Sequence, residues 1–276
     1  MAAKPYGELP LGQPTHYPDE YSPDLLVAIP RRLARQSLGV DESSLPFVGE
    51  DIWNAYELSW LNRRGLPQVA TAEFRFPCNS PSIIESKSFK LYLNSLNQAV
   101  FADRNQLART LEKDLASCAG SPVAIKLLAI HDCSSRSFEE LPGTSLDSLE
   151  VVIDQYLPDA GLLRTNSSIE VDRVVHSHLF RSLCPVTAQP DWASVWVAYH
   201  GVEIVPESLL QYLVSYRCHQ GFHEQCVEKI FVDLMQACEP ARLTVGARFS
   251  RRGGLDINPV RSTESVRHAN PRLFRQ

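Results

Sequence analysis

Apolar residues recur with two different periods along this chain, and each change of period indicates a new element. Strict alternation over residues 52–60 and again over residues 68–76 predicts two strands, and the polar turn between them predicts a hairpin. Helical spacing then predicts one helix through residues 89–96 and another through residues 107–115. A further strand is expected at residues 122–130.

The second half of the chain repeats this order of elements. Strands are expected near residues 169–180 and 192–199, helices through residues 209–216 and 227–234, and a strand at residues 243–249. The repeat has an offset of about 120 residues, at which identical residues recur. They include Tyr92 and Tyr212, Leu93 and Leu213, Ser95 and Ser215, and Cys118 and Cys238. The pattern predicts the α+β class, with antiparallel strands and helices on one face, built twice.

The predicted modules follow an irregular segment. Residues 1–48 combine many Pro, Gly and polar residues with little periodicity, which predicts an N-terminal arm. Residues 49–140 are then expected to form the first module and residues 141–276 the second.

Composition narrows the classes of function. With 44% hydrophobic residues the 276-residue chain can bury a sizeable core, and its net charge of −5 argues against direct nucleic-acid binding as the main activity. Seven cysteines, an odd number without regular spacing, favour a reducing compartment and hence the cytoplasm. We expect no membrane association, because no apolar run approaches membrane-spanning length and the N-terminus lacks a signal-peptide core.

Cys184 and Asp191 lie in the turn region of the second predicted hairpin. Pro185 prevents regular helix there, so we expect a loop cysteine that a substrate can reach. A thiolate is a strong nucleophile, and a buried carboxyl group could give it a proton donor. The alternatives are a small buried cysteine and an ordinary Pro190–Asp191 turn.

Phe222, His223 and Glu224 stand at the start of a predicted helix. Glutamate suits the edge of a guanine-like base, because it accepts hydrogen bonds from the ring N–H and the exocyclic amine together. Phe222 could stack on such a base or pack in the core. A rival interpretation uses His219, His223 and Cys226 as three zinc ligands. A helix that starts at the glycine-containing linker after His219 would leave His219 off the shared face.

Two cationic segments could hold phosphate. Glu85 precedes a helix start that offers hydroxyls, backbone N–H groups and two cations, from Ser86, Lys87, Ser88 and Lys90. Near the C-terminus, where arginines far outnumber acidic residues, Arg251, Arg252 and Gly253 could place guanidinium groups on phosphates. The alternatives are a capped amphipathic helix and a solvated tail. No G-x-G-x-x-G follows a predicted strand, so there is no Rossmann fingerprint.

The strings Glu85–Tyr92, Leu183–Pro185 with Asp191–Trp192, and Phe222–Cys226 together resemble the NADPH-dependent 7-cyano-7-deazaguanine reductases. These are the nitrile reductases of queuosine biosynthesis, and the chain resembles their long, two-module form. The resemblance implies two tandem tunnelling-fold modules and a homodimer that acts on a small-molecule 7-deazaguanine nitrile.

The resemblance also assigns roles. Cys184 would add to the nitrile carbon to form a covalent thioimidate, Asp191 would protonate the nitrogen, and His223 would help in proton delivery. Glu85 and Glu224 would bind the base, assisted by Phe222, while the two cationic segments would hold NADPH. No metal is expected. A zinc-dependent cyclohydrolase or pterin-type enzyme on the same fold, and a non-catalytic nucleobase-binding module, remain open alternatives.

Overall fold

A computed structural model describes residues 18, 20–130 and 137–276, which form two compact units. The first unit comprises the described residues up to Leu33, the described residues within Asp51–Ser137, and Arg251–Ile257. The second unit comprises Ala34–Glu50, Phe138–Ser250 and Asn258–Gln276. Residues 1–17 and 19 of the predicted arm lie outside the described residues.

The predicted hairpin of the first unit is confirmed. It consists of β2 (Val48–Leu61) and β3 (Pro67–Pro77), and β5 (Ala124–Leu128) pairs antiparallel with β3, giving the strand order β5-β3-β2. A separate small sheet pairs β1 (Ala28–Pro30) with β4 (Ser82–Ile84). Part of the predicted arm is therefore regular structure, because residues 28–30 supply a strand to β4.

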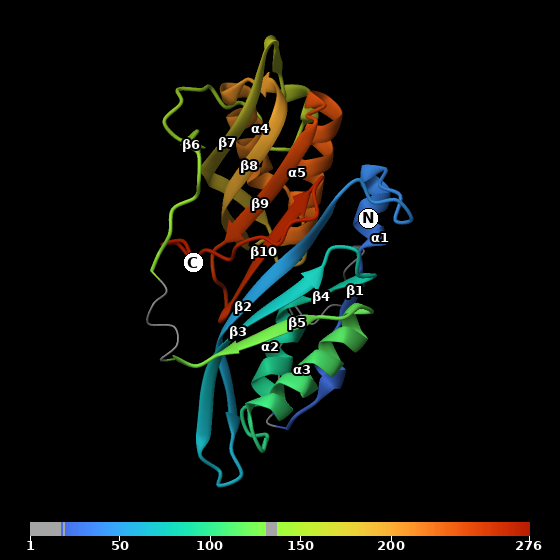
Figure 1. Cartoon of the computed structure of the whole chain (residues 1–276), viewed down its shortest axis with the longest axis vertical. Coiled ribbons are helices and arrows are strands. Elements are labelled where there is room, and N and C mark those ends of the chain that lie inside the picture. Colours follow the sequence, from blue (N-terminus) through green and yellow to red (C-terminus); the bar gives the residue numbers. More distant parts are fainter. Residues whose placement is uncertain (1–17, 19, 131–136) are drawn as a thin grey trace. The chain divides into compact units, whose positions relative to one another are not determined.

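Both predicted helices of the first unit are present, as α2 (Ser86–Ser95) and α3 (Arg104–Ala119), and they lie on one face of its strands (Figure 1). Their apolar sides bury a core that includes Trp53, Phe74 and Phe89. Asp103 caps the start of α3 by accepting the N–H of Gln106. The apolar spacing in the sequence thus reports the face that each helix buries.

The strands of the second unit are β6 (Thr144–Ser145), β7 (Thr165–Leu183), β8 (Pro190–Ile204), β9 (Arg242–Phe249) and, from Asn258 onward, β10 (Leu255–Ser262). Their order is β10-β9-β8-β7-β6, and neighbouring strands are antiparallel except β6 and β7, which are parallel. The unit thus has the predicted mixed α+β composition with a largely antiparallel sheet.

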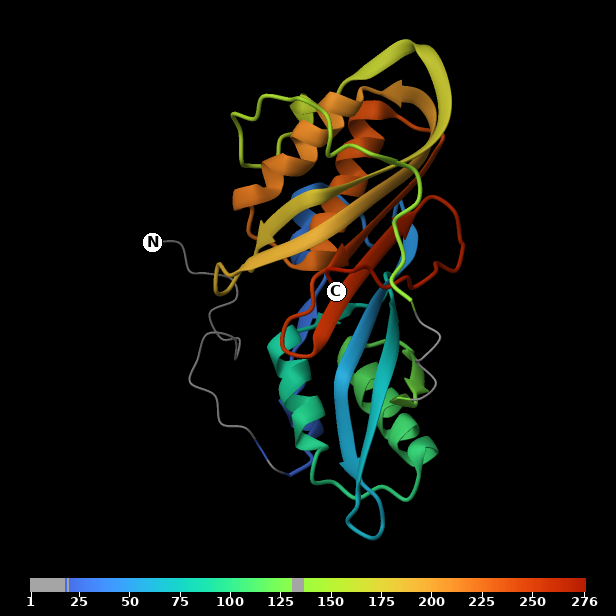
Figure 2. The same cartoon turned by 90° about the vertical axis from the view of Figure 1, so that its left-hand side faces the viewer.

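Two helices, α4 (Pro206–Ser215) and α5 (His223–Cys238), lie on one face of these strands (Figure 2). Both were predicted from helical spacing. The remaining short helices of the described chain are α1 (Arg32–Arg35), η1 (Pro23–Leu25), η2 (Gln36–Leu38), η4 (Ala160–Leu162) and η5 (Tyr216–Cys218).

Strand β10 was not predicted, and the interpretation of the C-terminal arginines as a solvated tail is wrong for two of them. Arg248 and Arg261 are 3% and 0% exposed. Arg261 donates to Glu228 of α5 at 2.8 Å, and Arg35 donates to the same carboxylate at 2.8 Å. The guanidinium groups of Arg261 and Arg35 can be buried because the Glu228 carboxylate compensates their positive charge. Because Glu228 lies near the start of α5, its contacts with Arg35 and Arg261 also fix the position of that part of the helix.

None of the helices that the structure describes combines the length and the apolar character that crossing a membrane would require.

Candidate active site

Cys184 lies in the tight turn that joins β7 to β8. Its N–H donates to the carbonyl of Gln189 at 2.9 Å, and its carbonyl accepts from the N–H of Ala188 at 2.9 Å. Ala188 adopts a left-handed conformation with φ of 57°, which lets the chain reverse within these few residues. The predicted position of Cys184 in a loop is therefore confirmed.

The thiol is nevertheless enclosed, so the expectation of an accessible cysteine is wrong for this form of the protein. Cys184 is only 2% exposed. The segment before α5 bonds to the end of β7, because the N–H of Leu183 donates to His219 and the N–H of Gly221 donates to Leu183, at 2.8 and 3.1 Å. This long-range pairing brings the start of α5 to the turn that carries Cys184.

Asp191 and His223 are in direct contact at the same end of the sheet. Nε2 of His223 lies 3.4 Å from Oδ2 of Asp191. Asp191 is paired in register with Ser182, one position after the pair Leu183–Pro190 that adjoins Cys184. The structure thus brings Asp191 and His223 together beside the Cys184 turn.

The imidazole of His223 is held by an aromatic neighbour. It stacks on Phe249 at the end of β9, with ring centroids 3.7 Å apart and the rings within 3° of parallel. The position of His223 as the first residue of α5 fixes its backbone, and the stack fixes its ring. A positioned imidazole beside a buried carboxyl group can hold or pass a proton.

Phe222 and Glu224 flank His223 at the start of α5, as predicted. Phe222 precedes the first helical turn and its N–H donates to the side chain of Gln225 at 3.2 Å. Glu224 lies in that first turn and is 3% exposed. The positive end of the helix dipole favours a carboxylate there. The two side chains therefore have fixed places next to His223.

Cys226 differs from a catalytic thiol. Full burial raises the pKa of the Cys226 thiol to about 12, and the charges of Asp191 and Glu224 add to that rise, while the nearby Ser182 hydroxyl opposes it. A thiol with such a pKa stays protonated near neutral pH and is a poor nucleophile. Burial also raises the pKa of Cys118 and of Cys238 to about 11. Cys226 and Cys238 are buried, and the half-buried Cys118 packs against the core of the first unit.

The zinc interpretation finds no arrangement to support it. In the part of the chain that the structure describes, no three His, Cys, Asp or Glu side chains are grouped so that they could hold a metal ion. His219 lies before α5, and burial lowers its pKa.

Glu85, which was predicted to bind the base, lies in the first unit and caps helix α2. Its carboxylate caps α2 by accepting the N–H groups of Lys87 and Ser88, at 2.9 and 2.7 Å, and the residue is 0% exposed. The hydroxyl of Ser88 donates to the carbonyl of Glu85 and accepts from the N–H of Val27. These bonds occupy the carboxylate in capping the helix. The role of Glu85 in binding the base stays a prediction.

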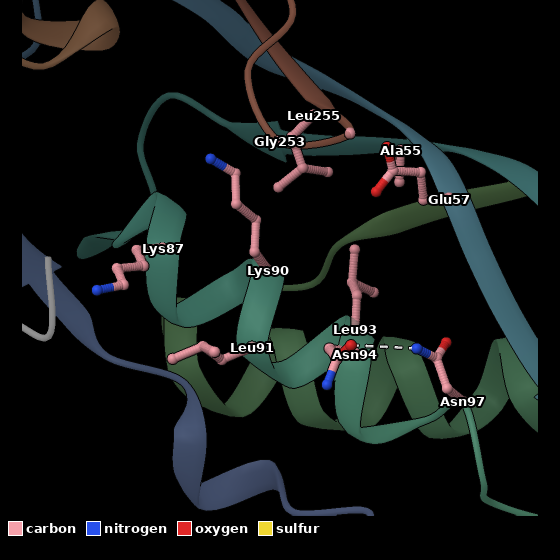
Figure 3. Close-up of a pocket in the computed structure, with 11 residues that line it drawn as sticks. Ala55, Glu57, Lys87, Lys90, Leu91, Leu93, Asn94, Asn97, Gly253 and Leu255 are labelled. Carbon is pink, nitrogen blue, oxygen red and sulfur yellow. Dashed lines mark hydrogen bonds between the residues drawn. The ribbon is translucent and has the colours of Figure 1, made fainter. Parts of the chain in front are cut away.

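A cavity of about 330 Å³ opens beside α2 and contains three of the predicted phosphate-binding residues. Lys87, Lys90 and Gly253 line it, and Ser86 precedes Lys87 on the same helix (Figure 3). The ammonium group of Lys90 points toward Gly253, where a Cβ would come within 3.0 Å of it. The cavity therefore places the positive charge of Lys90 next to the backbone of Gly253, which has no side chain to block a ligand.

The turn that carries Gly253 is tight. The N–H of Arg252 donates to the carbonyl of Leu255 at 2.8 Å, and Gly253 and Gly254 between them have φ of 57° and 76°. Two successive positive φ angles are typical of a hairpin turn that glycine favours. Arg251 extends from this turn over the ring of Tyr56, at 4.8 Å from its centroid.

Several residues at these sites were not predicted. Phe249 gave only the signal of a buried strand, and nothing in its spacing indicates the contact with His223. Glu57, Asn94 and Asn97 line the cavity beside α2 (Figure 3), and Asn97 donates to Asn94 at 3.2 Å. Asn94 and Asn97 are three apart on the turn that ends α2, so their shared side could have been read from the helical period.

Two protein-family models match this chain, one in its first half and one in its second half. A family model described as "Nitrile reductase, 7-cyano-7-deazaguanine-reductase N-term" matches residues 17–127, and a model described as "QueF-like protein" matches residues 190–268. Two similar curated proteins, from Chromohalobacter salexigens and Dechloromonas aromatica, are both named NADPH-dependent 7-cyano-7-deazaguanine reductase.

The first is 52% identical over 97% of this chain and 96% of its own length, and the second 50% identical over 95% and 92%. Such identity over almost the whole of each protein leaves no large part of the chain unmatched. With the residues of the Cys184 turn and the Asp191–His223 contact in place, the chain belongs to the 7-cyano-7-deazaguanine reductase family of nitrile reductases.

Proposed function

We propose that this protein reduces the nitrile of 7-cyano-7-deazaguanine to the primary amine 7-aminomethyl-7-deazaguanine with two NADPH. The reaction belongs to the biosynthesis of queuosine, a tRNA modification. The observation that carries the proposal is the contact of 3.4 Å between His223 and Asp191 beside the Cys184 turn, in a chain about half identical to reductases of that name.

In the first half of the reaction the Cys184 thiolate adds to the nitrile carbon and Asp191 delivers a proton to the nitrogen, which gives a covalent thioimidate. A nucleophile needs a proton donor nearby because the addition places negative charge on nitrogen. The place of Asp191 supports this role, since its carboxyl group is buried beside the Cys184 turn and in contact with His223.

In the second half a hydride reaches the thioimidate carbon, the thiolate leaves, and an imine forms. A second hydride and a proton then give the amine, with His223 helping in proton delivery. The imine would be hydrolysed by water, so the site must stay closed between the two hydride transfers. The small exposure of Cys184, 2%, supports such enclosure.

The base is bound by Glu224, whose carboxylate accepts hydrogen bonds from the guanine-like edge, with Phe222 packed against the ring. Both residues adjoin His223, so recognition and proton transfer come from consecutive residues of one chain segment. A carboxylate suits this edge because it offers acceptors only.

NADPH supplies the hydrides, and the cavity beside α2 fits part of it. Lys87 and Lys90 would meet phosphate, and the glycine turn lets the backbone approach closely. Arg251 and Arg252 adjoin that turn and would add guanidinium groups. A volume of about 330 Å³ is small for a whole dinucleotide, so the cavity would hold one portion of the molecule.

We further propose that residues 49–140 and 141–276 are tandem tunnelling-fold modules. Helix α2 begins at Ser86 and α4 at Pro206, 120 residues later, and α3 and α5 each have 16 residues. The hydroxyl of Tyr92 donates to Asp114 at 2.7 Å and that of Tyr212 to Asp233 at 2.6 Å. The same buried pair in both halves supports a duplication.

The assembly and location follow from the family resemblance and the cysteines. We propose a homodimer that works in the cytoplasm without contacting nucleic acid directly. No disulfide joins any of the six cysteines that the structure describes, which suits a reducing compartment.

The test of the function is NADPH oxidation on adding the nitrile, followed by absorbance, with and without a metal chelator. We expect oxidation that depends on the nitrile and is unaffected by the chelator, because the proposed chemistry uses no metal. Loss of the activity with chelator, and its return with zinc, would favour the zinc enzyme instead.

Removing charge from the cavity should weaken NADPH binding far more than nitrile binding. We expect Lys87→Gln, Lys90→Gln, Arg251→Gln and Arg252→Gln each to cost about 1.5–3 kcal/mol of NADPH binding free energy where a phosphate contact is lost. Titration calorimetry with NADPH measures this. Lys113→Gln, an equal charge change on the exposed side of α3, is the control and should leave the affinity unchanged.

Unchanged NADPH affinity in all four variants would mean that the phosphates bind elsewhere. Equal losses for nitrile and NADPH would instead indicate a general disturbance of the first unit.

A further inference from the structure

Three arginines surround one partly exposed tryptophan in the second unit. The guanidinium carbons of Arg181, Arg217 and Arg275 lie 5.6, 5.7 and 5.7 Å from the ring centroid of Trp192, which is 36% exposed. The three come from β7, from the short helix η5 and from the C-terminal segment. Segments far apart in sequence thus place three positive charges around a single indole.

The cluster lies close to Asp191 in the strand but faces away from it. Arg181 and Trp192 are register partners on β7 and β8, so their side chains share one face of the sheet. Ser182 and Asp191 are the next pair, and their side chains project from the opposite face. The cluster is therefore a separate surface from the Asp191–His223 contact.

The charges of this cluster are not neutralised by carboxylates in the described part of the chain. None of the three arginines makes an ion pair with another described residue, and Nε of Arg181 is buried without a hydrogen-bond partner there. Arg275 donates to the backbone carbonyl of His178 at 2.8 Å. The indole attracts each guanidinium group but carries no net charge, so the mutual repulsion of the three remains.

We propose that Arg181, Arg217, Arg275 and Trp192 form a binding site for a phosphate-bearing ligand. Guanidinium groups match phosphate oxygens with paired donors, and several around one point recognise phosphate better than a single cation does. The exposed indole offers a surface on which a nucleotide base can stack.

The ligand that this chemistry fits is a dinucleotide cofactor, and its identification as NADPH rests on the proposed function. The nitrile substrate is uncharged and carries no phosphate. NADPH has phosphate at two separate positions, the pyrophosphate and the 2′-phosphate, and both are anionic groups that guanidinium groups can bind. Free inorganic phosphate or pyrophosphate is the other source of the same chemistry.

The test is titration calorimetry of the full chain with inorganic pyrophosphate, which needs no catalysis. We expect the wild type to bind it, and Arg181→Gln/Arg217→Gln to bind it at least about tenfold more weakly. Arg217→Gln/Arg275→Gln should act in the same direction and spares the half-buried Arg181, in case the first variant does not fold. Arg242→Gln, which changes an exposed arginine paired with Asp172, is the matched control and should bind normally.

The KM values for NADPH and for the nitrile then identify the source. A raised KM for NADPH with an unchanged KM for the nitrile supports the dinucleotide, and weakened pyrophosphate binding alone supports a site for free phosphate. Pyrophosphate affinity equal in the wild type and both double variants would overturn the proposal. A smaller particle mass by light scattering with unchanged pyrophosphate affinity would also overturn it, because the cluster would then be a subunit contact.

Discussion

Cys184→Ala is expected to abolish turnover, with kcat lowered by at least about 10⁴-fold, because the covalent step has no other nucleophile. The wild type, given the nitrile without NADPH, should accumulate the thioimidate as a mass adduct on Cys184. Intact-protein mass spectrometry followed by peptide mapping measures both its presence and its position. The variant should give no adduct while keeping its fold, since a buried cysteine and an alanine differ only by the thiol.

Cys226→Ala and Cys238→Ala are the matched controls. Both cysteines are buried and lie on α5, and burial keeps their thiols protonated. Each variant should therefore retain the adduct and most of the turnover. An adduct mapped to Cys226, or no adduct on any cysteine, would show that the covalent mechanism assigned to Cys184 is wrong.

Glu224→Gln is expected to lower nitrile affinity strongly. The amide replaces one acceptor with an N–H donor that faces the ligand's own N–H, and the residue is 3% exposed, so water cannot relieve the clash. Such unpaired polar groups cost about 1–3 kcal/mol. NADPH binding should barely change. Titration calorimetry with each ligand measures the two affinities.

Asp191→Asn should show the opposite behaviour. The nitrile should still bind, because the carboxyl group is not needed to recognise the base. Thioimidate formation should be suppressed, because an amide cannot deliver the proton that the nitrogen requires. Adduct yield by mass spectrometry, compared with nitrile affinity, separates the two effects. Equal loss of affinity in both variants, or none in Glu224→Gln, would contradict the assigned roles.

The regular elements near the sites were predictable because each buries one apolar face. The alternation in β2 and β3 and the helical spacing in α2 and α5 are local properties of the sequence. The start of α5 at His223 followed from the same reasoning. Local pattern therefore placed His223 and Glu224 at a helix start.

Strand β10 escaped prediction because its burial depends on distant partners. It carries Arg261 and Pro259, which are unusual inside a sheet, and the buried Arg261 depends on Glu228 of α5 and on backbone carbonyls to accept its hydrogen bonds. The preceding Gly253 and Gly254 were a usable signal, because paired glycines with positive φ are typical of a tight hairpin turn.

The surroundings of the predicted site residues depend on tertiary contacts that no spacing reports. Cys184 is buried next to Leu183, which pairs with residues 219–221 from a distant part of the sequence. Glu85 caps α2 with the carboxylate that was expected to bind the base. The cluster around Trp192 combines arginines from three segments, so only the folded chain brings them together.

The ratio of NADPH consumed to amine formed tests the proposed four-electron reduction most directly. NADPH loss would be followed by absorbance and the amine quantified by mass spectrometry in the same sample, with purified protein and limiting nitrile. Two NADPH per amine, with no aldehyde released, is the predicted result, because both hydrides are transferred before water reaches the imine. A ratio of one with aldehyde as the product, or amine formed without NADPH loss, would contradict it.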